Sequence, residues 1–333
     1  MFKISKLSNE NLDQLFRLYE YRFGLRKEIV EKDFRVTFLL YFLFNVSAFH
    51  DYFIFKGGTS LSKCYNLISR FSEDIDLILK WHYITDESPD LTRSKTKQNE
   101  YNKKINKETE EFLNEKFIPI LKEELEKAFD FNILIQVDPE NSQVVNFYYP
   151  KLYNDSKTSI LQYIKLEIGT LGALTPTEIM PIKPLIASLN FPELNSLETS
   201  VVTVTATRTF WEKITILHHE ANRPKESEMP LRYSRHYYDV YSIGHSAIKE
   251  KAFNDLDLLK NVASYKEKFY PRNWAKYGEA FPPTLKLIPP SYRFNSLKKD
   301  YIDMQEMIYN NPPSFEELIA YLKKLEDEIN ALV

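Results

Sequence analysis

The pattern of apolar and polar positions divides the chain into a mixed first part and a helical second part. Residues 9–22 and 25–48 have the spacing of helices with a buried side, and 90–130 is a charged helical region. We predict strands at five short β-rich runs: 52–56, 74–80, 132–137, 144–149 and 161–169. Residues 170–192 are rich in proline, so we expect loops around short helices there.

After Thr209 the pattern is helical to the end of the chain, and Ser314 with Glu317 predicts a capping box before the last helix. The pattern of apolar and polar positions is weakest at 190–208. We therefore predict a domain at 1–205 and a second, mainly helical domain at 206–333. The fold class that follows is α+β, a mixed sheet with flanking helices plus the helical domain.

The stretch "FKGGTSLSKCYNLISRFSEDIDLIL", residues 55–79, stands out because the whole chain has only 7 glycines. We expect Gly57 and Gly58 to lie between a strand and a helix at 59–68, with Thr59 or Ser60 as the N-cap. Backbone N–H groups at such a helix start bind phosphate, and glycine allows a close approach. The hydroxyls would add donors. The alternative is an ordinary strand-to-helix turn.

Two acids follow this predicted helix, Asp74 and Asp76, on one face of the strand at 74–80. Side chains two residues apart in a strand lie about 6–7 Å from each other on the same side. Their repulsion is relieved by a divalent cation, and Mg²⁺ prefers carboxylate oxygens. Glu167, on the polar face of the strand at 161–169, is a candidate third acid, although a lone Glu on such a face is usually just solvated. Three carboxylates suit two-metal phosphoryl or nucleotidyl transfer.

The predicted C-terminal helices carry a second set of candidates. In "TFWEKITILHHEA" the apolar stripe leaves Lys213 at its edge, where the ammonium could reach either a cleft or solvent. In "RYSRHYYDV", Arg232, Arg235 and Asp239 share one helical face, with His236 beside them. Asp239 could orient Lys213 or an arginine toward a triphosphate, or pair simply with Arg235 four residues away.

Overall charge and composition limit the partners. The net charge of -3 means that a nucleic acid would have to be held by a local patch. Residues 92–107 contain six Lys or Arg and one Glu, which is either such a patch or a solvated helix face. The longest apolar stretch, 36–49, is too short to span a bilayer. With one cysteine and no signal-peptide pattern, we expect a cytoplasmic protein without a membrane partner.

The glycine and Asp-x-Asp stretch resembles the AbiEii/AbiGii-type nucleotidyltransferase toxins, within the DNA polymerase beta-like superfamily. The resemblance covers about residues 25–245. It includes four further segments: "VEKDF" (30–34), "IKLEIG" (164–169), "RTFWEKITILHHEA" (208–221) and "RYSRHYYDVYSI" (232–243). Phe34–Arg35 stands where the family pattern has Tyr-Trp.

This resemblance implies a toxin of a two-gene toxin–antitoxin or phage-defence system, with an antitoxin partner. Some members transfer nucleotides to the 3′ end of tRNA. It also implies that Gly58 and Ser60 bind phosphate, that Asp74 and Asp76 bind metal, that Lys213 contacts the nucleotide, and that Asp239 is the acid of the second lobe.

Our leading hypothesis is therefore an Mg²⁺-dependent transferase, with one or two ions, that moves NMP from an NTP to RNA and blocks translation. The expected acceptor is the 3′ end of tRNA. The catalytic candidates are Asp74, Asp76, Glu167, Lys213 and Asp239, and the metal candidates are Asp74, Asp76 and Glu167. The nucleotide-binding candidates are Gly57, Gly58, Thr59, Ser60, Lys63, Lys213 and Arg235.

Two alternatives remain open from the sequence. The acceptor could be a small molecule, such as an aminoglycoside antibiotic, or a protein hydroxyl. The chain could also be a nucleotide-binding or partner-binding module without turnover.

Overall fold

A computed structural model describes residues 7–129, 133–153, 161, 163–309 and 311–332. The chain forms two compact units. The first, which we call the sheet unit, comprises Met1–Cys64 and Ser72–Val204. The second, the helical unit, comprises Tyr65–Phe71 and Thr205–Val333. The short segment Tyr65–Phe71 is therefore separated in sequence from the rest of its unit.

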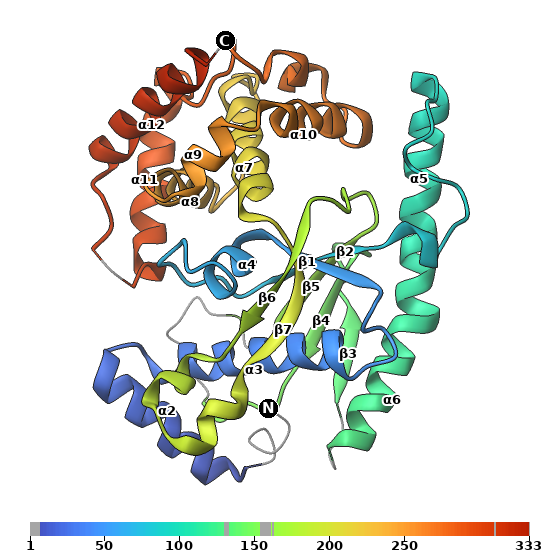
Figure 1. Cartoon of the computed structure of the whole chain (residues 1–333), viewed down its shortest axis with the longest axis vertical. Helices are drawn as coiled ribbons and strands as arrows, with labels where there is room; N and C mark the ends of the chain where they lie inside the picture. The colour runs from blue at the N-terminus through green and yellow to red at the C-terminus, as the bar shows by residue number, and fades with distance from the viewer. Residues whose placement is uncertain (1–6, 130–132, 154–160, 162, 310, 333) are drawn as a thin grey trace. The chain divides into compact units, whose positions relative to one another are not determined.

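The sheet unit is built on one seven-stranded mixed sheet, in the order β3-β4-β5-β2-β1-β7-β6 (Figure 1). β1 pairs antiparallel with β2 and parallel with β7, and β2 pairs parallel with β5. This arrangement confirms the α+β prediction. The strands are β1 Phe53–Lys56, β2 Ile75–Leu79, β3 Leu134–Val137, β4 Val144–Tyr148, β5 Ile164–Gly169, β6 Thr177–Ile182 and β7 Thr199–Val204.

Two of these strands contradict the sequence prediction. β6 lies where proline predicted loops, and β7 lies where we placed the weakest pattern. β6 is at the edge of the sheet, the position in a sheet where Pro181 is tolerated, and most of its residues are exposed or half-buried. β7 is a β-branched run that lies between β1 and β6.

Helices cover the sheet and supply its core. α3 is buried along most of its length and contacts β7 and α2, with Phe16 against Phe34 at a centroid distance of 5.7 Å. The charged helical region begins at a Ser94 N-cap and is interrupted by a π-helical turn, Leu113–Phe117. The helices of this unit are α2 Asn9–Phe23, α3 Lys27–Asn45, α4 Gly57–Lys63, α5 Lys95–Phe112 and α6 Ile118–Ala128.

In the helical unit, α7 contacts α8, α9 and α10, while α12 contacts α8. The predicted capping box at Ser314 and Glu317 is present. The helices are α7 Ala206–Ala221, α8 Ser234–Gly244, α9 Ile248–Phe253, α10 Leu256–Phe269, α11 Phe294–Met304 and α12 Phe315–Asn330. Among the described residues of the whole chain, no helix combines the length and the apolar character that crossing a membrane requires.

Candidate active site

Asp74 and Asp76 occupy one side of the start of β2. The strand begins at Ile75, so Asp74 directly precedes it. Ile75 and Leu77 are fully buried, whereas Asp74 and Asp76 are half-buried. This alternation is the one that the sequence predicted, and it turns the two carboxylates away from the core.

Glu167 lies directly beside Asp76 in the sheet. In the parallel pair of β2 and β5, Asp76 is in register with Glu167, and on its other side β1 places Lys56 in register with Asp76. Residues directly opposite each other in neighbouring strands project to the same face, about 5 Å apart. Glu167 is exposed on this face. Sequence patterns did not single out Lys56, because the pairing of β1 with β2 cannot be read from one strand.

Asp74, Asp76 and Glu167 meet only some of the requirements of a metal site. In the described portion of the chain, no three His, Cys, Asp or Glu side chains are grouped closely enough to hold a metal ion by themselves. Mg²⁺, however, is usually held by one or two carboxylates and completes its shell with water and substrate phosphate oxygens. Asp74 and Asp76 suit that mode of binding, and Glu167 stays a predicted ligand.

Gly57 lies against the carboxylate of Asp76. Its φ of +84° is one that side chains with a β-carbon rarely adopt, and a β-carbon built on it would lie 1.9 Å from Asp76 Oδ2. Glycine is therefore needed for backbone conformation and for space. α4 starts at Gly57, with Lys56 in the N-cap position, and ends at Lys63. The predicted helix is therefore present, but its bounds of 59–68 and its cap at Thr59 or Ser60 were wrong.

The hydroxyls of Thr59 and Ser60 make internal hydrogen bonds. Thr59 Oγ1 donates to the carbonyl of Asp74 and lies 3.0 Å from Ser72 Oγ, and Ser60 Oγ donates to the carbonyl of Gly57 at 2.9 Å. Both side chains are fully buried. Thr59 thus fixes the backbone of Asp74. A phosphate-binding role of Gly57, Gly58, Thr59 and Ser60 stays a prediction.

A buried ion pair supports the backbone next to the acids. Lys32 on α3 is 1% exposed, and its ammonium pairs with Glu73, the residue before Asp74. It also donates to the carbonyl of Leu161 at 2.6 Å. Burial lowers the pKa of Lys32, while the charges of Glu73 and Asp74 oppose that shift. Lys32 therefore anchors the segment that precedes Asp74.

The next residue of α3, Asp33, engages Lys63. The Lys63 ammonium pairs with Asp33 and donates to the carbonyl of Lys183 at 3.3 Å, while Asp33 accepts a 2.7 Å hydrogen bond from the amide of Leu185. Lys63 thus joins the end of α4 to α3. Its assignment to nucleotide binding stays a prediction.

The helical unit contains a buried charge cluster around Asp239 on α8. Arg70 binds its carboxylate with two parallel hydrogen bonds of 2.7 and 2.8 Å, and Lys213 on α7 binds Oδ2 at 2.7 Å. Lys213 Nζ also lies 3.1 Å from His236 Nδ1. An ammonium only donates, so Nδ1 is the acceptor. Asp239 is 0% exposed, which explains why it needs both cations.

Electrostatics fix the protonation states in this cluster. Burial acts to raise the pKa of Asp239, but Arg70 and Lys213 outweigh it and hold that pKa well below its usual range. Burial lowers the pKa of Lys213, and Asp239 opposes the shift. Burial, followed by the charges of Lys213 and Arg235, lowers the pKa of His236 far below its ordinary value, so the imidazole is neutral.

Two of the sequence interpretations of this cluster need correction. Asp239 does not pair with Arg235, since Arg70 and Lys213 occupy its carboxylate. Within the described residues, the half-buried Arg235 forms no ion pair. Lys213 is 6% exposed, so it does not extend into solvent. Arg70 was missed because it belongs to a short segment without periodicity, 169 residues from its partner.

The family model described as "Nucleotidyl transferase AbiEii toxin, Type IV TA system" matches residues 39–321. The chain belongs to the AbiEii nucleotidyltransferase toxin family. It is thus a nucleotidyltransferase toxin of a type IV toxin–antitoxin system, which implies an NTP substrate and an antitoxin partner. The family match confirms the resemblance on which the sequence interpretation rested.

Solved structures give more distant similarities. MenT4, a nucleotidyltransferase toxin from Mycobacterium tuberculosis H37Rv, is 15% identical with a TM-score of 0.49, over 98% of this chain and 90% of that one. JHP933 from Helicobacter pylori is 16% identical with a TM-score of 0.34, over 91% of this chain and 95% of that one. A comparison with curated proteins finds no match. The AbiEii assignment therefore rests on the family model.

Proposed function

We propose that this AbiEii-family toxin transfers NMP from an NTP to an RNA, with the 3′ end of tRNA as acceptor, in an Mg²⁺-dependent reaction that blocks translation. The observation that carries the chemistry is Asp76, which lies against Gly57 at the start of α4 and in register with Glu167. A carboxylate beside a helix start suits a metal-bound phosphate.

Each residue has a proposed task. Asp74 and Asp76 offer carboxylate oxygens to Mg²⁺, which when bound neutralises and aligns phosphate oxygens. Glu167, exposed next to Asp76, would accept the proton of the RNA hydroxyl as it attacks the α-phosphorus of the NTP, which breaks the α–β phosphoanhydride bond and releases pyrophosphate. The amides at Gly57 and Gly58 would bind phosphate oxygens.

Lys213 is the proposed contact to the triphosphate. An ammonium has three donors, and Lys213 uses two of them on Asp239 and His236. Arg70, Lys213 and Arg235 supply three positive charges against the one negative charge of Asp239, because His236 is neutral. The net excess of two positive charges suits an anionic nucleotide.

The test uses the full chain with each α-labelled NTP, Mg²⁺ and total RNA. We expect wild type to label RNA. Asp76→Asn should label it at least about a thousandfold more slowly, which corresponds to a loss of about 4 kcal/mol of transition-state stabilisation. The control is Asp303→Asn, which changes an exposed acid on α11 and should leave the rate unchanged. RNA left unlabelled by wild type under every NTP contradicts the proposal. If added aminoglycosides or proteins are labelled and RNA is not, the acceptor is a small molecule or a protein hydroxyl.

A further inference from the structure

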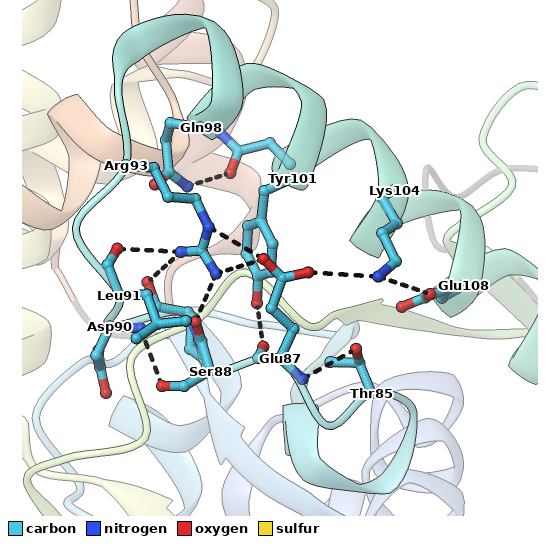
Figure 2. Close-up of polar contacts among 12 residues, drawn as sticks. Thr85, Glu87, Ser88, Asp90, Leu91, Arg93, Gln98, Tyr101, Lys104 and Glu108 are labelled. Atoms are coloured by element: carbon cyan, nitrogen blue, oxygen red, sulfur yellow. Dashed lines mark hydrogen bonds and ion pairs between the residues drawn. The ribbon is translucent and has the colours of Figure 1, made fainter.

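The loop before α5 is folded around Arg93. Its guanidinium donates to Glu87 Oε1 at 2.9 Å and to the carbonyls of Ser88 and Leu91 at 2.7 and 3.1 Å (Figure 2). It also lies over the ring of Tyr101 at 3.8 Å. Only 6% of the Arg93 side chain is exposed. These contacts satisfy most of the donors of one guanidinium, so they hold the loop in a single arrangement.

Two further contacts attach this loop to α5. The hydroxyl of Tyr101 donates to the carbonyl of Glu87 at 3.0 Å, and Lys104 Nζ lies 3.3 Å from Glu87 Oε2 (Figure 2). Glu87 therefore connects both sides of the groove that forms between the loop and the helix.

This groove, which we call the α5 groove, has a volume of about 780 Å³ and is open to solvent. That volume is within the range of ligand sites, but small-molecule sites are mostly lined by apolar and aromatic groups. The α5 groove is lined mainly by charged and hydroxyl side chains, which favours a polar, charged ligand. The lining residues are Glu87, Leu91, Thr92, Arg93, Ser94, Lys97, Glu100, Tyr101 and Lys104.

Lys95 and Lys97 lie in the first turn of α5, where positive charge is unfavourable. Negative charge stabilises a helix N-terminus, yet the first turn of α5 has no acid and carries Lys95 and Lys97. In the described parts of the chain, neither of them nor Lys103 forms an ion pair, and all three are exposed. Residues 92–107 hold six positive charges and one negative in a chain whose net charge is -3. Arg93, Lys104 and Lys107 are engaged in ion pairs with Glu87, Glu108 and Glu111. Such pairs do not account for Lys95, Lys97 and Lys103, whose charges suit binding of a polyanion.

We propose that the α5 groove binds the phosphate backbone of the acceptor RNA. Lys97 and Lys104 are seven residues apart on α5, so they lie about 10 Å from each other along one face of the helix. The chain enters the loop from the end of β2, and Leu79 at that end is about 10 Å along the strand from Asp76. The loop side of the groove thus follows β2 in the chain, after the short turn Trp81–Tyr83. This inference rests on the proposed function.

The test is a charge reversal in the groove, Lys97→Glu with Lys104→Glu. The matched control is Lys122→Glu with Lys127→Glu, two exposed lysines on α6 outside the groove, which changes the net charge equally. Anisotropy titrations use labelled unfractionated tRNA at several salt concentrations. We expect the groove variant to bind about tenfold or more weakly, with a salt slope smaller by about two, and the control to change far less.

Two readouts separate this inference from the proposed function. Binding of NTP, measured without RNA, should be equal in wild type, groove variant and control. If wild type labels no RNA, the proposed function fails while the tRNA titrations still test the groove. If wild type labels RNA and the groove variant binds tRNA as tightly as the control, the groove assignment is overturned. It is equally overturned if the groove variant keeps tRNA binding and loses binding to the antitoxin.

Discussion

The carboxylate of Asp76 occupies the space that a side chain on Gly57 would fill, since a built β-carbon lies 1.9 Å from Asp76 Oδ2. The helix start and the acidic strand are thereby in direct contact. Any larger residue at 57 must move the carboxylate or the backbone.

Gly57→Ala should therefore lose activity. The positive φ and the clash together should lower the free energy of unfolding by about 1–3 kcal/mol. Because the displaced group is Asp76, NMP transfer should fall much more than stability does. Chemical unfolding and transfer rates of Gly57→Ala and Gly278→Ala measure both, because Gly278 has open space around it and no positive φ. Equal activity in both variants would refute the requirement for close contact.

Substitutions of Glu167 and of Asp76 should change different kinetic parameters. If Glu167 accepts a proton, Glu167→Gln should lower kcat by about a hundredfold, with KM for NTP unchanged. Asp76→Asn should lower kcat further and raise the Mg²⁺ concentration needed for half-maximal rate. Steady-state rates over an Mg²⁺ series give both values. A Glu167→Gln enzyme with wild-type kcat would reduce Glu167 to a solvated side chain.

Asp239 should matter more for stability than Lys213 does. Asp239→Asn leaves Arg70 and Lys213 buried without their anion, which should cost about 3–5 kcal/mol of unfolding free energy. Lys213→Met leaves the bidentate Arg70 pair intact, so stability should fall by less, while KM for NTP rises. Urea unfolding and nucleotide titration test this order. The reverse order would mean that the cluster is organised around the lysine.

The pair of Lys32 and Glu73 invites a double-mutant cycle. Lys32→Met or Glu73→Gln alone leaves a buried charge without its partner and should cost about 3–5 kcal/mol. The double variant should recover much of that loss. Because Glu73 precedes Asp74, transfer activity should stay low even where stability returns. Additive stability losses in the cycle would show that the pair is not coupled.

Acid should destabilise the helical unit through His218. Its Nδ1 accepts from the amide of Lys286 at 3.0 Å, so a proton there would replace an acceptor by a donor. Burial lowers the pKa of His218 to about 4, against about 6.5 in the unfolded chain. Between these two pH values the unfolded state therefore binds more protons than the folded state does. The contribution of His218 to the free energy of unfolding is complete above about pH 6.5 and is smaller by about 2 kcal/mol at pH 5. His218→Gln should flatten this dependence in urea unfolding.

The sequence predicted the site's local features better than its long-range partners. Asp74 and Asp76 on one face follow from strand alternation alone, and Lys213 at the edge of an apolar stripe follows from helical spacing. The register that places Glu167 beside Asp76 depends on pairing between strands about ninety residues apart. Lys32 with Glu73 and Arg70 with Asp239 depend on tertiary contacts between segments of unrelated pattern, so periodicity could not indicate them.

Arg70 belongs to a seven-residue segment that is separated in sequence from the rest of the helical unit. A gene fragment cut at residue 205 would therefore encode Asp239 without the guanidinium that binds both its oxygens. The two units are interleaved in the chain, so no single cut separates this toxin into its two units. A split version would have to carry Tyr65–Phe71 with the C-terminal piece, by circular permutation or by a grafted linker.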